Sequence, residues 1–138
     1  MVDEYNISID ISNLQEFSCG IFMKQIDLES IIVNMLTNSF EALKGTGGKR
    51  VIKISTIDFG EEYQIVFEDS GPGVPDNLKE WIFIPLNTTK EEDGVGLGLT
   101  IVKDIVESYN GKIEVGKSNA IGGAQFTVIF PVDEVKDE

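Results

Sequence analysis

The sequence predicts an α+β fold, a two-layer sandwich in which helices cover one face of a mixed, mostly antiparallel sheet. Two observations carry this prediction: strand patterns come in consecutive pairs, and two segments place apolar residues at helical spacing. Consecutive strands stand too close together for crossover helices, which argues against a doubly wound parallel sheet. At 138 residues, 41% of them hydrophobic, the chain is long enough for a single domain, 1–138, with a real core.

The chain is expected to begin with two strands. Residues 5–11 alternate and place Ile7, Ile9 and Ile11 on one face, the pattern of a strand. Residues 16–23 form a weaker strand pattern.

A long helix and a hairpin are predicted next. The helix covers residues 27–43, with Asp27 suited to its N-cap and Gly45 to its end. Its apolar positions follow helical spacing: Leu28, Ile31, Ile32, Met35, Leu36, Ala42 and Leu43. Two strands, 49–58 and 62–69, then form the hairpin. The second strand places four side chains on one face: Tyr63, Ile65, Phe67 and Asp69.

The C-terminal half is expected to add a second amphipathic helix and two closing strands. In order, the segments are a short helix over 76–83, a polar segment over 86–93, a helix over 99–109, and strands over 112–117 and 124–130. Asn110-Gly111 ends the second helix. The last strand points four residues inward: Ala124, Phe126, Val128 and Phe130.

Composition excludes several classes of function. With 11 basic and 24 acidic residues the net charge is −13, so the domain should repel nucleic acid and anionic lipid. The single cysteine, Cys19, excludes an intrachain disulfide and fits a reducing compartment. The chain has no histidine, which excludes a His triad and a phospho-accepting histidine of its own. No apolar stretch approaches the roughly 20 residues of a membrane span.

Two asparagines form the first candidate site. Asn34 and Asn38 stand four residues apart, away from the apolar stripe, so both amides emerge on one side of the helix, with Glu41 one turn further on. Amide oxygens are hard ligands that suit Mg²⁺ together with phosphates and water. The alternative is an ordinary solvated helix face.

The second candidate is the segment Asp69-Ser-Gly71-Pro-Gly73 at the end of a strand. A Gly-Pro turn does not require Asp69 on the same face as Ile65 and Phe67. A carboxylate in an apolar layer is costly unless it accepts strong hydrogen bonds, which the amino group of a buried purine would supply. The alternative is a plain Gly-Pro turn.

The third candidate is a glycine run, Gly94-Val95-Gly96-Leu97-Gly98, that opens a helix. Free N–H groups and the helix dipole favour an anion there. The run lacks the Gly-Lys-Ser/Thr ending of a P-loop and the preceding strand of a dinucleotide site. Lys90 lies just before the run and is well placed to reach a phosphate. The alternatives are a flexible hinge and a solvated loop lysine.

Together these segments resemble the Bergerat-fold (GHKL) ATP-binding family of histidine kinases, gyrase B subunits, heat-shock chaperones and mismatch-repair ATPases. Residues 31–42 are similar to its N box, 69–73 to its G1 box, 81–90 to its F box, 94–102 to its G2 box and 122–131 to its closing strand. The resemblance covers about residues 5–131. Within the family, the chain most resembles the catalytic domains of histidine kinases, whose F box carries Thr-Thr-Lys.

The resemblance implies binding of Mg·ATP. Asn38 would bind Mg²⁺, assisted by Asn34, while Asp69 would receive the adenine amino group. The catalytic residues would be Asn34, Asn38 and Lys90. The resemblance also implies which residues bind the nucleotide, line its base pocket or form the lid over its phosphates. They are Asn38, Glu41, Asp69, Gly71, Gly73, Lys90, Gly94, Val95, Gly96, Leu97 and Gly98.

The function so implied is that of the catalytic domain of a two-component sensor kinase. It would pass the γ-phosphate to a histidine on a separate dimerisation domain, with a response regulator downstream, in the cytoplasm and without direct membrane contact. The alternatives are a nucleotide-dependent interaction switch and an anti-sigma-type serine kinase. Asn34 replaces the glutamate of the hydrolytic members, which disfavours hydrolysis because an amide takes no proton from water. Leu86 and Asn87 depart from the usual aromatic residue of the F box, and residues 86–98 are expected to be mobile without nucleotide.

Overall fold

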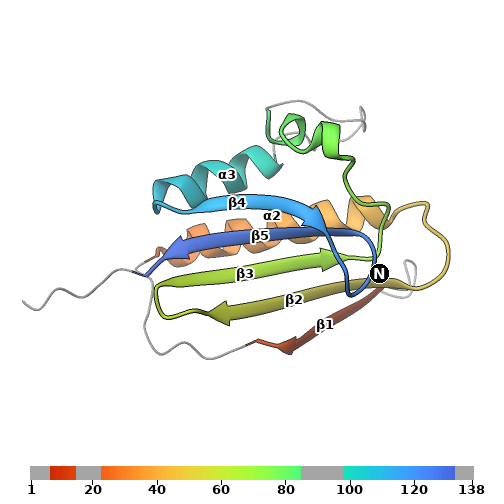
Figure 1. The fold of residues 1–138 in the computed structure, drawn as a ribbon, viewed down its shortest axis with the longest axis horizontal. Coiled ribbons are helices and arrows are strands. Elements are labelled where there is room, and N and C mark those ends of the chain that lie inside the picture. Colours follow the sequence, from red (N-terminus) through yellow and green to blue (C-terminus); the bar gives the residue numbers. More distant parts are fainter. Residues whose placement is uncertain (1–6, 15–22, 85–97, 133–138) are drawn as a thin grey trace, which may run out of the picture.

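A computed structural model describes residues 7–14, 23–84 and 98–132 (Figure 1). Its elements are β1 (Ile7–Asn13), α2 (Gln25–Leu43), β2 (Arg50–Asp58), β3 (Glu62–Asp69), the 3₁₀ turns η1 (Asp76–Leu78) and η2 (Trp81–Phe83), α3 (Gly98–Ser108), β4 (Lys112–Lys117) and β5 (Ala124–Pro131). This order confirms the predicted α+β fold. The expected strand over 16–23, apart from Met23, and the polar segment over 86–93 lie outside the described residues.

The five strands form one mixed sheet in the order β1-β2-β3-β5-β4. β1 runs parallel to β2, and the other neighbouring pairs are antiparallel. The predicted hairpin is present, with Asp58 opposite Tyr63 near its turn and Ile52 opposite Asp69 at its far end. Both α-helices lie on one face of the sheet, next to each other (Figure 1). In the described ranges, neither α2 nor α3 combines the length and the apolar character that a membrane-spanning helix needs.

The core lies between the two helices and the face of the sheet that they cover. Its buried side chains are Ile31, Met35, Tyr63, Phe67, Val102, Val106, Ala124, Phe126, Val128 and Phe130. The inward residues predicted for β5 are all present in this set. The apolar row predicted for the first strand has a different environment: Ile9 is 47% and Ile11 56% exposed, because β1 is the outermost strand.

Two local predictions need correction. α2 begins at Gln25 after an N-cap at Lys24, so Asp27 lies inside the first turn rather than at the cap. There its carboxylate accepts a hydrogen bond from the hydroxyl of Tyr109 at the end of α3. The single short helix expected over 76–83 is divided into the two 3₁₀ turns η1 and η2.

Candidate functional site

Asp69 ends β3 with its side chain on the helix-covered face of the sheet. It is 1% exposed, as the alternation that turns Tyr63 and Phe67 inward requires. Its Oδ1 accepts hydrogen bonds from the backbone N–H of Gly71 at 2.9 Å and of Ala124 at 3.3 Å. Burial of a carboxylate costs free energy unless such bonds compensate, so these donors hold the side chain in place.

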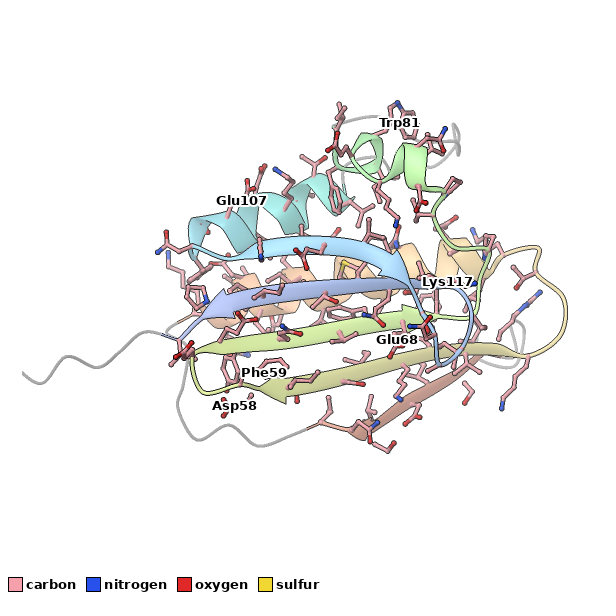
Figure 2. The ribbon with its side chains drawn as sticks, in the orientation of Figure 1. Asp58, Phe59, Glu68, Trp81, Glu107 and Lys117 are labelled. Carbon is pink, nitrogen blue, oxygen red and sulfur yellow. The ribbon has the colours of Figure 1, made fainter. Side chains whose placement is uncertain are left out.

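The preceding carboxylate, Glu68, lies on the opposite face of β3 (Figure 2). It is 7% exposed, and its Oε1 accepts a hydrogen bond of 2.8 Å from the hydroxyl of Ser118. Two consecutive buried carboxylates therefore have different surroundings, and Asp69 is the one on the side of the helices.

Two glycines, Gly71 and Gly123, pack closely against Asp69, and Gly73 adjoins Gly123. A Cβ on Gly71 would stand 3.0 Å from the carbonyl oxygen of Ala42 and 3.0 Å from Asp69 Oδ1. A Cβ on Gly123 would stand 2.2 Å from the backbone oxygen of Asp69, a distance that no side chain permits. Gly73 has a φ of 80°, in the left-handed region that glycine adopts freely. Gly123 was not among the residues predicted for the site; the sequence signal for it is the Gly-Gly pair directly before the last strand.

Asn34 and Asn38 are half-buried and, one turn apart, face the same side of α2. The side-chain Nδ2 of Asn34 donates to the backbone oxygen of Ser30 at 2.7 Å and lies 3.2 Å from the Ser30 hydroxyl. A Cβ on Gly98, the first residue of α3, would stand 3.3 Å from Asn34 Oδ1. The fold thus brings Asn34 to the start of α3.

Asn34, Asn38 and Ala42 form a line along α2, at positions i, i+4 and i+8, which we call the α2 row. Because a helix rises about 1.5 Å per residue, the row is about 12 Å long. Gly98 adjoins its first residue and Gly71 its last. The row therefore extends from the start of α3 to the buried carboxylate of Asp69 and the glycines packed against it.

Glu41 lies beside the row, with its side chain 14% exposed. Its Oε1 forms an ion pair of 3.0 Å with Lys44 Nζ. This predicted nucleotide-binding residue therefore already forms an ion pair with the residue that caps the end of its helix.

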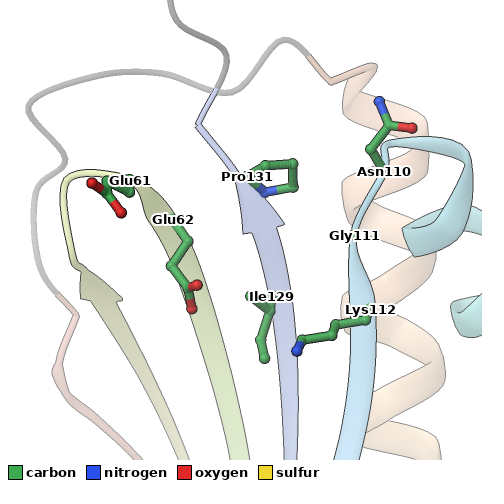
Figure 3. A pocket seen from close by; sticks show the side chains of 7 residues that line it. All are labelled: Glu61, Glu62, Asn110, Gly111, Lys112, Ile129 and Pro131. Carbon is green, nitrogen blue, oxygen red and sulfur yellow. The ribbon is translucent and has the colours of Figure 1, made fainter.

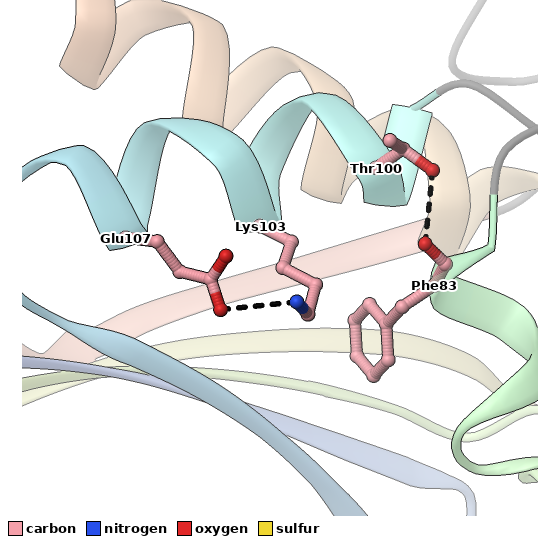
Figure 4. A network of polar contacts seen from close by, with 4 residues as sticks. All are labelled: Phe83, Thr100, Lys103 and Glu107. Carbon is pink, nitrogen blue, oxygen red and sulfur yellow. Dashed lines mark hydrogen bonds and ion pairs between the residues drawn. The ribbon is translucent and has the colours of Figure 1, made fainter.

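Five predicted residues lie outside the described residues: Lys90, Gly94, Val95, Gly96 and Leu97. On either side of this gap, the hydroxyl of Thr100 donates to the backbone oxygen of Phe83 at 3.1 Å (Figure 4). The ring of Phe83 in turn packs edge-on against Phe126, with centroids 6.5 Å apart. The last described residues before the gap and the first after it are therefore fixed to each other and to the core.

A hollow of about 390 Å³ lies at the opposite end of β3 (Figure 3). Its lining residues are Glu61, Glu62, Asn110, Gly111, Lys112, Ile129 and Pro131. It contains none of the predicted site residues. Across the described part of the chain, no group of three or more acidic, cysteine or histidine side chains is arranged to hold a metal ion.

Comparison with known proteins identifies the family of the chain. The sequence model of one family, described as histidine kinase-, DNA gyrase B-, and HSP90-like ATPase, matches residues 23–134. Sensor protein CitS of Halalkalibacterium halodurans is 35% identical over 136 residues, which are 97% of this chain and 25% of CitS. This chain spans about a third or less of the length of the first curated relatives that it matches.

Two solved structures extend the likeness to three dimensions. The catalytic domain of histidine kinase ThkA, in a nucleotide-free form, superimposes with a TM-score of 0.79 at 30% identity, covering 95% of this chain and 82% of that one. Full-length ShkA in complex with AMPPNP gives a TM-score of 0.72 at 28% identity, covering 95% of this chain and 27% of that one.

Proposed function

We propose that this chain binds Mg·ATP as the phosphate donor of a sensor histidine kinase, because of the family to which it belongs. The chain belongs to the histidine kinase-, DNA gyrase B-, and HSP90-like ATPase family. It has the fold of a histidine kinase catalytic domain. The reaction would transfer the γ-phosphoryl group to a histidine on a separate dimerisation domain. The observation that carries the proposal is the α2 row, with a buried carboxylate at one end and the start of α3 at the other.

The Asp69 end suits the adenine. The space around Asp69 is bounded by glycines, so backbone rather than side chains would face a flat base. A buried carboxylate is a strong acceptor for an exocyclic amino group, and Asp69 is anchored for that task by the Gly71 and Ala124 N–H groups. Gly73 completes the proposed base pocket.

The Asn34 end suits the metal and the phosphates. Mg²⁺ prefers oxygen ligands, keeps several waters and is commonly bound by one or two protein groups together with phosphates. The side-chain amide oxygens of Asn34 and Asn38 fit that requirement, and both residues are half-buried on α2. When bound, the ion would neutralise charge on the phosphate oxygens.

The remaining nucleotide contacts are proposed from the resemblance alone. Lys90 and the glycines of the run 94–98 would contact the phosphates; Gly98, the one residue of that run within the described ranges, lies beside Asn34. Glu41 is a weaker candidate, since Lys44 already pairs with it.

The acceptor must come from outside this chain, because the sequence holds no histidine. Asn34 supports transfer to a partner over hydrolysis, since an amide cannot act as a general base toward water. The full-length relatives are named as sensor proteins, so a histidine-bearing dimerisation domain and a response regulator are the proposed partners. An ATP-dependent reaction with these partners implies a cytoplasmic location for the domain.

Labelled ATP tests the proposal directly. The chain is mixed with a separately expressed histidine-bearing helical domain, Mg²⁺ and γ-labelled ATP, and the product is treated with acid. We expect acid-labile label on the helical domain, and much less label at the same ATP concentration when Asp69→Asn replaces the wild-type chain. Nucleotide binding without label transfer would support an interaction switch instead, and acid-stable label on a serine of a partner would support a serine kinase.

A further inference from the structure

The orientation of the Asn34 amide is fixed by its surroundings on α2. Its Nδ2 lies 2.7 Å from the backbone oxygen of Ser30 and 3.2 Å from the Ser30 hydroxyl. A carbonyl oxygen only accepts hydrogen bonds, so the group that points back along the helix must be the NH₂. The Oδ1 of Asn34 therefore points away from Ser30, toward Gly98.

The hydroxyl of Ser30 adds a second contact that holds the Asn34 side chain in place. In the helix, the backbone oxygen of Ser30 already accepts a hydrogen bond from the backbone N–H of Asn34. The side-chain NH₂ of Asn34 therefore shares this acceptor with its own backbone N–H. The hydroxyl oxygen offers the same NH₂ a second acceptor. The backbone oxygen, which only accepts, selects the NH₂ over Oδ1, and the hydroxyl opposes displacement of the side chain away from Ser30. With the hydroxyl removed, the side chain keeps one of these two contacts.

We propose that Ser30 is a positioning residue that holds the Asn34 carbonyl oxygen toward the metal and phosphate end of the α2 row. The inference rests on the proposed function, because it assigns Ser30 a role at that same site. Ser30 touches neither nucleotide nor metal in this account, and it acts through the orientation of Asn34.

α2 offers a matched control. The hydroxyl of Thr37, on the same helix, donates to the backbone oxygen of Val33 at 2.8 Å. Thr37 is exposed, and its hydroxyl does not contact Asn34. Thr37→Val therefore removes a comparable hydroxyl from the same helix without disturbing the asparagine.

The first measurement needs no nucleotide. Side-chain amide resonances of Asn34 are recorded by NMR in the wild-type chain, Ser30→Ala, Ser30→Thr and Thr37→Val. We expect Ser30→Ala to shift the Asn34 NH₂ signals and to speed their exchange with solvent, while Ser30→Thr and Thr37→Val leave both near the wild-type values. Unchanged Asn34 signals in Ser30→Ala would overturn the proposal.

The second measurement compares nucleotide affinity with and without Mg²⁺ by calorimetry. Loss of one hydrogen bond predicts that Ser30→Ala reduces the affinity gained from Mg²⁺ by about two- to tenfold, with metal-free ATP bound as before. An equal loss with and without Mg²⁺ would make Ser30 merely structural and overturn its role toward the metal. A wild-type chain that gains no affinity from Mg²⁺ would instead refute the metal site of the proposed function, and the resonances would still decide whether Ser30 holds the amide.

Discussion

At the scale of single residues, the central feature is a carboxylate at the end of a core strand. Asp69 is 1% exposed and keeps its position through two backbone N–H groups. The alternation of β3 predicted which face it occupies. The donors were not predictable, because the Ala124 N–H comes from a strand 55 residues further along the chain.

Replacement of Asp69 tests its proposed role. Asp69→Asn should weaken ATP binding by about ten- to a hundredfold, because a charge-assisted hydrogen bond in a buried site contributes about 1.5–3 kcal/mol. Calorimetric titration measures the change. Glu68→Gln is the control: it alters the neighbouring buried carboxylate on the opposite face and should leave ATP affinity unchanged. Equal affinities for the wild-type and Asp69→Asn chains would remove Asp69 from the site.

Gly123 gives a second test at this scale. Gly123→Ala would place a Cβ 2.2 Å from the backbone oxygen of Asp69 and 2.6 Å from the Gly71 nitrogen. Such overpacking costs about 1–3 kcal/mol, so the unfolding midpoint in urea should fall. Gly116→Ala, whose Cβ would meet nothing within 4 Å, should change the midpoint far less. Similar midpoints for the two variants would contradict the close packing around Asp69.

At the scale of elements, tertiary contacts explain where local patterns mislead. Asp27 has the sequence character of an N-cap, yet its carboxylate accepts a hydrogen bond from the Tyr109 hydroxyl, and the helix begins two residues earlier. The hydroxyl of Tyr109 also accepts the Lys24 N–H at 3.0 Å. A residue 82 positions away thus joins the start of α2 to the end of α3, which no local pattern reveals.

This contact predicts a pH dependence of stability. The bond to the Asp27 carboxylate raises the pKa of Tyr109 above its ordinary value, since the carboxylate favours the protonated phenol. The stabilisation is therefore fully present below the ordinary tyrosine pKa of about 10 and is lost as pH rises through the higher folded value.

Tyr109→Phe removes the hydroxyl and keeps the ring on Phe130, whose centroid lies 6.4 Å away. We expect the variant to unfold at a lower temperature than wild type, by a margin that stays constant from pH 6 to about 9 and narrows above about 10. Thermal unfolding followed by circular dichroism measures the margin. A margin that widens at alkaline pH would show that the hydroxyl does not stabilise the fold in this way.

At the scale of the whole molecule, the net charge of −13 opposes the approach of an anionic nucleotide. Salt screens this repulsion, with a Debye length that falls from about 30 Å at 0.01 M to about 8 Å at 0.15 M. The association rate of Mg·ATP should therefore rise with added salt, as measured by stopped-flow fluorescence with a labelled nucleotide. A rate that falls with salt would indicate that a local positive field, such as that of Lys90, dominates the approach.

Much of the fold followed from sequence patterns because its elements are locally consistent. Strand alternation identified the inward rows of β3 and β5, and helical spacing identified α2 and α3. The patterns did not give the strand order β1-β2-β3-β5-β4, which depends on long-range pairing. The same limit applies to the candidate site: sequence patterns proposed Asp69, Asn34 and Asn38, whose roles stay predictions, whereas Gly123 and Ser30 enter it only through contacts between or along elements.

A structure with bound nucleotide tests the central claim most directly. Crystals grown with Mg²⁺ and a non-hydrolysable ATP analogue should show the adenine amino group at Asp69, the triphosphate along the α2 row, and the metal next to the amide oxygens of Asn34 and Asn38. The row is about 12 Å long, which separates the two ends of the nucleotide clearly in electron density. The analogue in the hollow at the opposite end of β3, or with its base at Asn34, would contradict the account.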